Sequence, residues 1–304
     1  MRNVTNTVLR LNGKYEGGYV SRNAISLKQK LRENKPLACL GVFDSLTALV
    51  AEQAGFEVAF VSGSAVAYSQ LARPDIGLIT LTEMAFALDR IRDRVDIDLF
   101  VDADSGFGSA FNVQRTVRTL ERAGASGIQL EDQENTKRAD LVTARPVIAK
   151  GAMVGKIKAA LDARQNSETL ISARTDSMYT LGLDESLERA DAFLDAGADM
   201  VFVEGLTDQS DIRLVGDLCK GRAPVLYNML DPTRFSMHEL NTLGISMVLY
   251  PSVLIESVAQ SAVQAAAELA NSLSINGGAT IKSQTIKTLI GADEYLERGY
   301  EYRR

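Results

Sequence analysis

Short apolar runs alternate with longer amphipathic stretches from residue 37 onward. Eight of these runs are apolar at nearly every position, which is typical of strands buried on both faces of a parallel sheet. The runs are 38–43, 58–63, 98–104, 127–132, 169–175, 199–205, 224–228 and 247–251. Their regular spacing, with no Pro-, Gly- or Ser-rich linker, predicts an α/β fold with one closed (β/α)₈ TIM barrel. A doubly wound open sheet is the alternative.

The stretches between the runs carry helix start and stop signals. Helices are predicted over 45–55, 80–95, 111–124, 184–197 and 236–244. Ser45 is expected to cap the first helix, and Thr80 with Glu83 has the spacing of a capping box. Glycines at the ends of these helices suit left-handed cap positions.

Three units are expected along the chain. Residues 1–25 are polar and lack the apolar core of a secretory signal, so they are interpreted as an N-terminal arm. Residues 26–255 form the barrel, and 256–304 form extra C-terminal helices, which are interpreted as a packing or oligomer arm. The connection 133–168 is long and begins after a strand end, where barrel enzymes place active-site lids.

Composition narrows the class of protein. The 304 residues are 46% hydrophobic and 24% charged, and the net charge of −6 argues against a nucleic-acid partner. No apolar run is long enough to predict a membrane span. Cys39 and Cys219 lack metal-ligand spacing and are expected in the core of a cytoplasmic protein. The single histidine, His238, falls in a helix pattern and is expected to face solvent.

Polar residues follow most of the predicted strands, at the end where barrels place their active sites. They are Asp44, Ser62, Gly63, Ser64, Asp102, Asp104, Glu131, Asp132, Arg174, Asp176, Glu204 and Asn228, with Asp75 in the loop after the second strand. Gathered carboxylates repel one another unless a cation is present, and Mg²⁺ prefers oxygen ligands. We expect Asp102 to bind Mg²⁺ or Mn²⁺ directly. Asp104, Glu131 and Asp75 are expected to hold the waters bound to the metal.

Simpler interpretations compete for several of these residues. An aspartate after a strand is often a helix cap or a turn former, which is the expectation for Asp44, Asp132 and Asp176. The Ser62-Gly63-Ser64 run is either a tight turn or a nest of backbone amides that binds an anion.

Several segments carry a family resemblance. They are 43–56, 61–67, 73–83, VDADSGFG (101–108), 112–133, ARTDS (173–177) and FVEG (202–205). Together they resemble the isocitrate lyase / phosphoenolpyruvate mutase superfamily, in particular the short-chain branch that includes 2-methylisocitrate lyase. The resemblance implies a Mg²⁺-dependent lyase that acts on a small 2-oxo or 2-hydroxy carboxylate. It also implies a tetramer in which the last helices are exchanged between subunits.

The same resemblance implies roles for individual residues. Asp102 matches the direct metal ligand, and Asp75, Asp104 and Glu131 match the carboxylates around the metal. Ser62, Gly63 and Ser64 match the segment that holds the substrate carboxylate, and Asn228 matches a further pocket residue. Arg174 matches the substrate-binding arginine. With Glu204 and Asp75, it completes the predicted catalytic set.

The sequence departs from the family pattern in two places. The lyases carry Lys-(Lys/Arg)-Cys-Gly-His in the lid, where the cysteine is the proposed acid, and this chain has Lys-Arg-Ala-Asp-Leu at 137–141. The residues that follow Asn228 also differ. Cleavage of a hydroxy acid needs an acid to protonate the leaving carbanion, whereas decarboxylation of a 2-oxo acid can take its proton from solvent.

Three functions follow from this departure. The first is a decarboxylase of oxaloacetate or a related 2-oxo dicarboxylate that works through a pyruvate enolate. The alternative is a carbon–carbon lyase of the 2-methylisocitrate or dimethylmalate type, or a phosphonopyruvate or carboxyphosphonoenolpyruvate mutase-type enzyme, with Asp140 as the acid. The third is a ligand-binding or assembly protein that has lost its chemistry.

Overall fold

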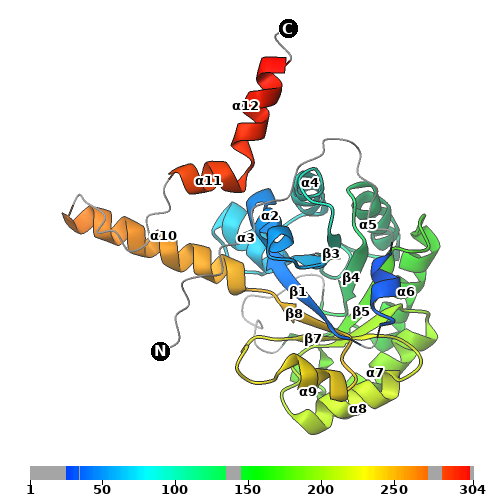
Figure 1. Ribbon diagram of the computed structural model, residues 1–304. Helices are drawn as coiled ribbons and strands as arrows, with labels where there is room; N and C mark the ends of the chain where they lie inside the picture. The colour runs from blue at the N-terminus through cyan, green and yellow to red at the C-terminus, as the bar shows by residue number, and fades with distance from the viewer. Residues whose placement is uncertain (1–24, 34, 135–144, 273–282, 302–304) are drawn as a thin grey trace.

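A closed parallel barrel forms the centre of the protein. The computed structural model describes residues 25–33, 35–134, 145–272 and 283–301. Eight strands pair in sequence order, and β8 returns to β1 (Figure 1). The strands are β1 (Leu37–Val42), β2 (Val58–Val61), β3 (Asp98–Asp102), β4 (Gly127–Glu131), β5 (Leu170–Thr175), β6 (Met200–Val203), β7 (Val225–Asn228) and β8 (Met247–Tyr250). Each overlaps one predicted run, so the predicted TIM barrel is confirmed.

Helices surround the barrel and continue beyond it. They are α1 (Leu27–Lys30), α2 (Ser45–Gln53), α3 (Gly63–Leu71), α4 (Leu81–Arg92), α5 (Ala110–Arg122), α6 (Lys150–Ala163), η2 (Ser177–Tyr179), α7 (Gly182–Asp195), α8 (Gln209–Cys219), α9 (Met237–Thr242), α10 (Val253–Ser272), α11 (Ser283–Leu289) and α12 (Ala292–Glu301). The five predicted helices are confirmed as α2, α4, α5, α7 and α9. Helices α3, α6 and α8 were not predicted.

Polar side chains cap the N-termini of α4 and α2. The Thr80–Glu83 capping box is present at the start of α4. The expected cap of α2 was wrong by one residue, because Asp44 accepts a hydrogen bond from the Thr47 backbone N–H at 2.8 Å and Ser45 is already helical. Asp44 is therefore a helix cap, as one interpretation of it expected.

The interior of the barrel is a packed apolar core, and α1 covers it at the end where the strands begin. Leu27 and Leu31 pack in one cluster with Phe60 and Phe100, whose side chains fill the lumen. Lys30 binds Asp98 at the start of β3, with 2.9 Å between Nζ and Oδ2. The end of the barrel where the strands begin is therefore filled, and the site must lie at the other end.

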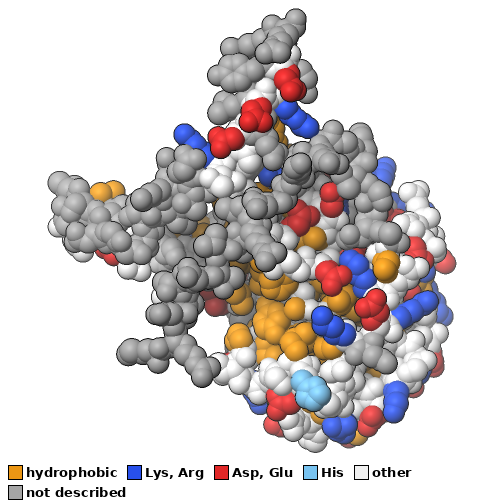
Figure 2. Space-filling view, viewed as in Figure 1, with side chains coloured by type: hydrophobic (Ala, Val, Ile, Leu, Met, Phe, Trp, Pro, Cys, Tyr) orange, Lys and Arg blue, Asp and Glu red, His pale blue; other side chains and the backbone are white. Residues whose placement is uncertain are grey.

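The two cysteines and the histidine lie where the sequence predicted. Cys39 and Cys219 are buried and free, and burial raises the pKa of Cys39 well above its usual range and that of Cys219 to about 11. Neutral, enclosed thiols are poor nucleophiles, so both serve as core residues. His238 is exposed at the surface, where the pale blue side chain is visible in Figure 2.

The C-terminal helices leave the barrel and return to it. Helix α10 projects outward, α11 lies back beside the barrel, where Gln53 Nε2 donates to the Leu289 carbonyl at 3.2 Å, and α12 extends away again (Figure 1). Val258, Val263 and Leu269 of α10 are exposed, Val263 by 71%. The predicted exchange of these helices between subunits stays a prediction. The predicted N-terminal arm, apart from Ile25, and the lid run 137–141 lie outside the described residues. In the part of the chain that is described, no helix is both long and apolar enough to cross a bilayer.

Gly41 allows the closest backbone contact between β1 and the segment after β8. A methyl group at this position would lie 2.1 Å from the carbonyl oxygen of Pro251, which is backbone and cannot rotate away. We expect Gly41→Ala to lower the free energy of unfolding by about 1–3 kcal/mol, the usual cost of overpacking. Denaturant unfolding measures this loss. Gly151→Ala in α6 is the matched control, because no atom lies within 4 Å of its added methyl group. An equal loss in both variants would contradict the packing argument.

Candidate active site

The end of β3 brings two aspartates to the same side of the chain. The strand stops at Asp102, and Asp104 has a φ of 45°, a left-handed conformation that aspartate tolerates better than most residues. The backbone N–H of Asp104 donates to Asp102 Oδ1 at 3.2 Å. In turn, the Asp104 carbonyl accepts from the Glu131 N–H at 2.9 Å, which joins this turn to β4. The sequence had required such a break if both side chains were to face the lumen, and the structure contains it.

Asp102, Asp104 and Glu131 form a compact acidic cluster. Each offers one carboxylate oxygen, and these oxygens all lie within 4.8 Å of one another. Lys156 from α6 is buried nearby and donates to the Ser105 carbonyl at 2.8 Å. Burial lowers the pKa of Lys156, and the charge of Glu131 opposes that shift. Glu131 also pairs with Arg174, with 3.6 Å between Oε2 and Nε. An all-oxygen donor set of three crowded carboxylates fits a hard divalent cation.

Asp102 also contacts the first turn of α3. Ser62 caps this helix, and its hydroxyl accepts from the Ala65 N–H at 3.3 Å. The Gly63 N–H donates to Asp102 Oδ2 at 3.3 Å, and a methyl group on Gly63 would lie 2.9 Å from that oxygen. The Ser62-Gly63-Ser64 run is therefore a helix N-terminus rather than an isolated tight turn. Only a glycine lets this helix approach the carboxylate so closely.

Two arginines share one buried aspartate on the other side of the pocket. Arg174, at the end of β5, donates through Nε to Asp176 Oδ2 and through Nη2 to Oδ1, both at 2.9 Å. Arg145 Nη1 donates to Asp176 Oδ1 at 2.8 Å. Burial alone would raise the pKa of Asp176, but the charge and hydrogen bonds of Arg174, and then those of Arg145, lower it. Asp176 stands at the N-cap position of η2, as the helix-cap interpretation expected, but its side chain makes no capping hydrogen bond and binds the two arginines instead.

Arg145 is a charged pocket residue that sequence reasoning missed. It precedes α6 in an irregular segment, where no hydrophobic period or motif marks it. Its backbone has a φ of 44°, and its guanidinium carbon lies 4.7 Å from the centre of the Tyr179 ring. This stacking and the ion pair to Asp176 fix the guanidinium in the pocket wall.

Glu204 and Asn228 form the next part of the rim. The Asn228 amide donates to Glu204 Oε2 at 3.2 Å, and the Tyr179 hydroxyl donates to Oε1 at 3.4 Å. Arg145 Nη1 lies 3.5 Å from the same Oε1. Glu204 is buried, and the Asn228 side-chain oxygen is buried without a hydrogen-bond partner among the described residues. That oxygen can accept a hydrogen bond from a ligand hydroxyl.

Asp132 has a structural role behind this rim. It accepts from Thr175 Oγ1 at 2.7 Å and from the Asp176 N–H at 2.9 Å, and Arg189 Nη1 pairs with it at 2.9 Å. Its expected role as a cap or turn former was wrong, because its partners come from β5 and α7. The network holds the end of β5, and with it Arg174, in place.

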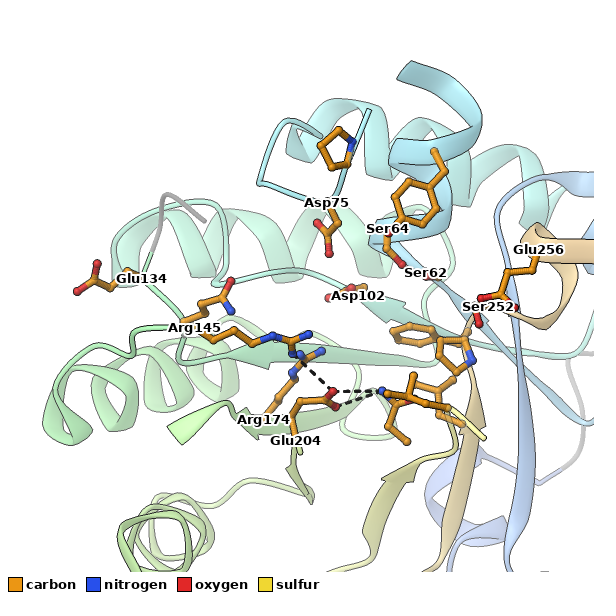
Figure 3. A pocket seen from close by; sticks show the side chains of 18 of the residues that line it. Ser62, Ser64, Asp75, Asp102, Glu134, Arg145, Arg174, Glu204, Ser252 and Glu256 are labelled. Carbon is orange, nitrogen blue, oxygen red and sulfur yellow. Dashed lines mark hydrogen bonds and ion pairs between the residues drawn. The ribbon is translucent and has the colours of Figure 1, made fainter. Parts of the chain in front are cut away.

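These groups surround one cavity of about 430 Å³, a size suited to a small ligand. The predicted residues that line it are Ser62, Ser64, Asp75, Asp102, Arg174, Glu204 and Asn228. Figure 3 shows Asp75 approaching from one side and Arg145 with Arg174 from the other. Asp75 lies outside the three-carboxylate cluster. Arg145, Ser252 and Glu256 also line the pocket, and none of them was predicted.

A TIM barrel with a charged pocket at the carboxyl ends of its strands has the architecture of an enzyme. A family model described as phosphoenolpyruvate phosphomutase matches residues 27–270. The chain therefore belongs to this family of magnesium-dependent lyases and mutases and is an enzyme.

Curated relatives agree with this assignment. The chain is 38% identical over 235 residues to the 2,3-dimethylmalate lyase of Eubacterium barkeri, covering 76% of this chain and 81% of the relative. It is 36% identical over 250 residues to the 2-methylisocitrate lyase of Shewanella oneidensis, covering 81% and 85%.

Solved structures show the same fold. A crystal structure of 2,3-dimethylmalate lyase superposes with a TM-score of 0.83 at 29% identity, covering 91% of this chain and 94% of that one. A phosphonopyruvate hydrolase complexed with oxalate and Mg²⁺ gives a TM-score of 0.83 at 25% identity, covering 91% and 98%.

Proposed function

We propose that the protein is a magnesium-dependent carbon–carbon lyase that cleaves a small 2-hydroxy di- or tricarboxylate into a 2-oxo acid and a second carboxylate. The observation that carries the proposal is the combination of opposite charges in one pocket. Three clustered carboxylates lie next to two guanidiniums that share Asp176, and Arg174 joins the two groups through Glu131 at 3.6 Å. The lyase activities of the two relatives named above support the same reaction class.

The acidic cluster is the proposed metal site. Asp102 is the direct ligand, and Asp104 and Glu131 hold the ion through its waters; Mn²⁺ can replace Mg²⁺. When bound, the ion supplies a Lewis acid that polarises the oxygen on the second carbon of the substrate. Asp75, which lines the same pocket as Asp102, would hold a further water.

The remaining groups act on the substrate directly. The N-terminus of α3, with Ser62, Gly63 and Ser64, binds the carboxylate next to the hydroxyl carbon. Glu204 accepts the hydroxyl proton while Asn228 fixes its orientation. The bond between the second and third carbons then breaks, and its electron pair is delocalised onto the distal carboxylate. Arg174 stabilises that charge, and an acid returns a proton to the third carbon. Asp140, the candidate acid, lies outside the described residues.

The lid sequence favours a second candidate function. Ala139 and Leu141 stand where the family lyases carry cysteine and histidine. Decarboxylation of oxaloacetate needs no acid from the lid. The bond to the distal carboxylate breaks, carbon dioxide leaves, and the pyruvate enolate takes a proton from solvent. The curated relatives support the lyase better than the decarboxylase.

One panel of substrates separates these functions. We expect Mg²⁺-dependent release of pyruvate from 2,3-dimethylmalate or 2-methylisocitrate, lost with a chelator. Turnover of oxaloacetate alone, above the background of free Mg²⁺, would identify the decarboxylase instead. If calorimetry detects binding of Mg²⁺ and oxalate but no substrate is turned over, the protein is a ligand-binding protein without catalytic activity.

We also infer a homo-oligomer, with a tetramer as the expected form and the cytoplasm as its location. The exposed apolar side chains along α10 support this assembly, because a protruding helix gains stability when a second chain covers it.

A further inference from the structure

Arg174 and Arg145, the two arginines in the pocket wall, each have N–H groups that Asp176 does not use. Arg174 uses Nε and Nη2 on Asp176, and Arg145 uses Nη1. Among the described residues, no hydrogen bond engages Arg174 Nη1 or Arg145 Nε and Nη2. One carboxylate therefore holds two cations and leaves donors of both available to a ligand.

Both guanidiniums are fixed by the residues beneath them. Arg145 stacks on Tyr179, and Arg174 lies 5.1 Å from the centre of the Phe202 ring. The Arg174 side chain is 14% exposed and that of Arg145 is 31% exposed. In Figure 3 the two side chains lie next to each other and reach the same part of the cavity. Arg145 is thus the more accessible member of a preorganised pair.

We propose that Arg145 determines substrate specificity by binding, together with Arg174, the distal carboxylate of the substrate. This inference rests on the proposed function and adds a residue to it. Two forked guanidiniums bind one carboxylate through several charge-assisted hydrogen bonds. A ligand without a distal carboxylate, such as oxalate, has no group to engage Arg145 when it binds at the metal end of the pocket.

The position of Arg145 also selects between the two candidate reactions. In the lyase reaction, the electron pair of the broken bond moves onto the distal carboxylate, so contacts to Arg145 strengthen in the transition state. In decarboxylation, that carboxylate leaves as neutral carbon dioxide, so the same contacts weaken in the transition state. Arg145 therefore favours the lyase reaction over decarboxylation.

The test compares a ligand with a distal carboxylate and one without. Calorimetry with Mg²⁺ present measures binding of 3,3-difluoro-oxaloacetate and of oxalate to the wild type, Arg145→Gln and Arg145→Lys. We expect Arg145→Gln to weaken the dicarboxylate about tenfold or more, the loss of a charge-assisted hydrogen bond. Oxalate affinity should change less than about twofold, and Arg145→Lys should keep part of the dicarboxylate affinity because it keeps the charge.

A matched control and a second measurement complete the experiment. Arg222→Gln removes an arginine outside the pocket that pairs with Asp191 and Asp195, and both ligands should bind it as they bind the wild type. In the pyruvate assay, Arg145→Gln should lower kcat for the lyase substrate more than for oxaloacetate.

Two results would overturn the inference, and a third would concern only the proposed function. Equal weakening of both ligands in Arg145→Gln would make Arg145 a structural support of the pocket. Unchanged dicarboxylate binding would show that Arg145 does not contact it. If the wild type binds neither ligand in the presence of Mg²⁺, the proposed function itself fails.

Discussion

Asp102→Ala is expected to abolish Mg²⁺ binding and turnover while leaving the barrel folded. The metal supplies several kcal/mol of transition-state stabilisation, so we expect kcat/KM to fall by about 10³-fold or more. Asp102 ends β3 and is the member of the acidic cluster that also lines the pocket. Calorimetric titration with Mg²⁺ and the pyruvate assay measure the two effects.

The stability of this variant separates a metal ligand from a structural residue. Removing one of three crowded carboxylates relieves repulsion, but it also removes the acceptor of the Gly63 and Asp104 N–H groups. Without metal, the free energy of unfolding should therefore fall by no more than about 1–2 kcal/mol. Asp208→Ala is the matched control, because Asp208 is exposed and makes no capping hydrogen bond with its side chain. Wild-type Mg²⁺ affinity in Asp102→Ala would contradict the assignment, and so would a large loss of apo stability.

The second large effect is expected at Asp176. Asp176→Asn leaves Arg174 and Arg145 in the pocket wall without their shared counter-charge, as when one partner of a buried ion pair is removed. We expect the free energy of unfolding at pH 7 to fall by about 3–5 kcal/mol. We also expect kcat/KM to fall, because both guanidiniums lose their fixed geometry. Denaturant unfolding and steady-state kinetics measure these losses, with the exposed Asp208→Asn as control.

The pH dependence of this loss has a defined sign. The folded-state pKa of Asp176 is lowered, so its stabilising contribution is fully present above the unfolded-state value of about 3.9. That contribution disappears as the pH falls through the lowered folded-state pKa. The stability difference between wild type and Asp176→Asn should therefore be constant from about pH 5 to 8 and should shrink in stronger acid. A difference that grows on acidification would contradict the ion-pair account.

The strands could be predicted because burial on both faces leaves a direct mark on the sequence. A parallel barrel strand faces the lumen on one side and the helices on the other, so nearly every position is apolar. The acidic cluster could be predicted for a related reason. The residues that follow parallel strands all gather at one end of the barrel, so their positions in the sequence place Asp102, Asp104 and Glu131 together.

The helices that were not predicted, α3, α6 and α8, contain glycines that weaken the helix pattern in the sequence. Helix α8 contains Gly216 in its interior, which weakens a helix pattern. The structure explains it, because a methyl group there would lie 2.0 Å from the carbonyl oxygen of Leu243. Helix α6 likewise contains Gly151 and Gly155, and α3 begins with Gly63, which makes room for Asp102. In α8 and α3 the glycine serves a contact with a distant segment.

The arginine pair could not be predicted because it depends on residues far apart in the chain. Asp176 follows a predicted strand, and this position suggested only a helix cap or a turn. Its role becomes evident once Arg145, from the segment before α6, donates to the same oxygen as Arg174. No periodicity or motif marks such a long-range partner.

The closure of the barrel by α1 has a consequence for the order of events during turnover. Among the described residues, Leu27 and Leu31 fill the end where the strands begin, so the pocket opens toward the carboxyl ends of the strands. In the proposed lyase reaction, the 2-oxo acid is bound deeper than its co-product and is therefore expected to leave last. We expect this keto acid to compete with fresh substrate for the same site and to inhibit the enzyme as it accumulates.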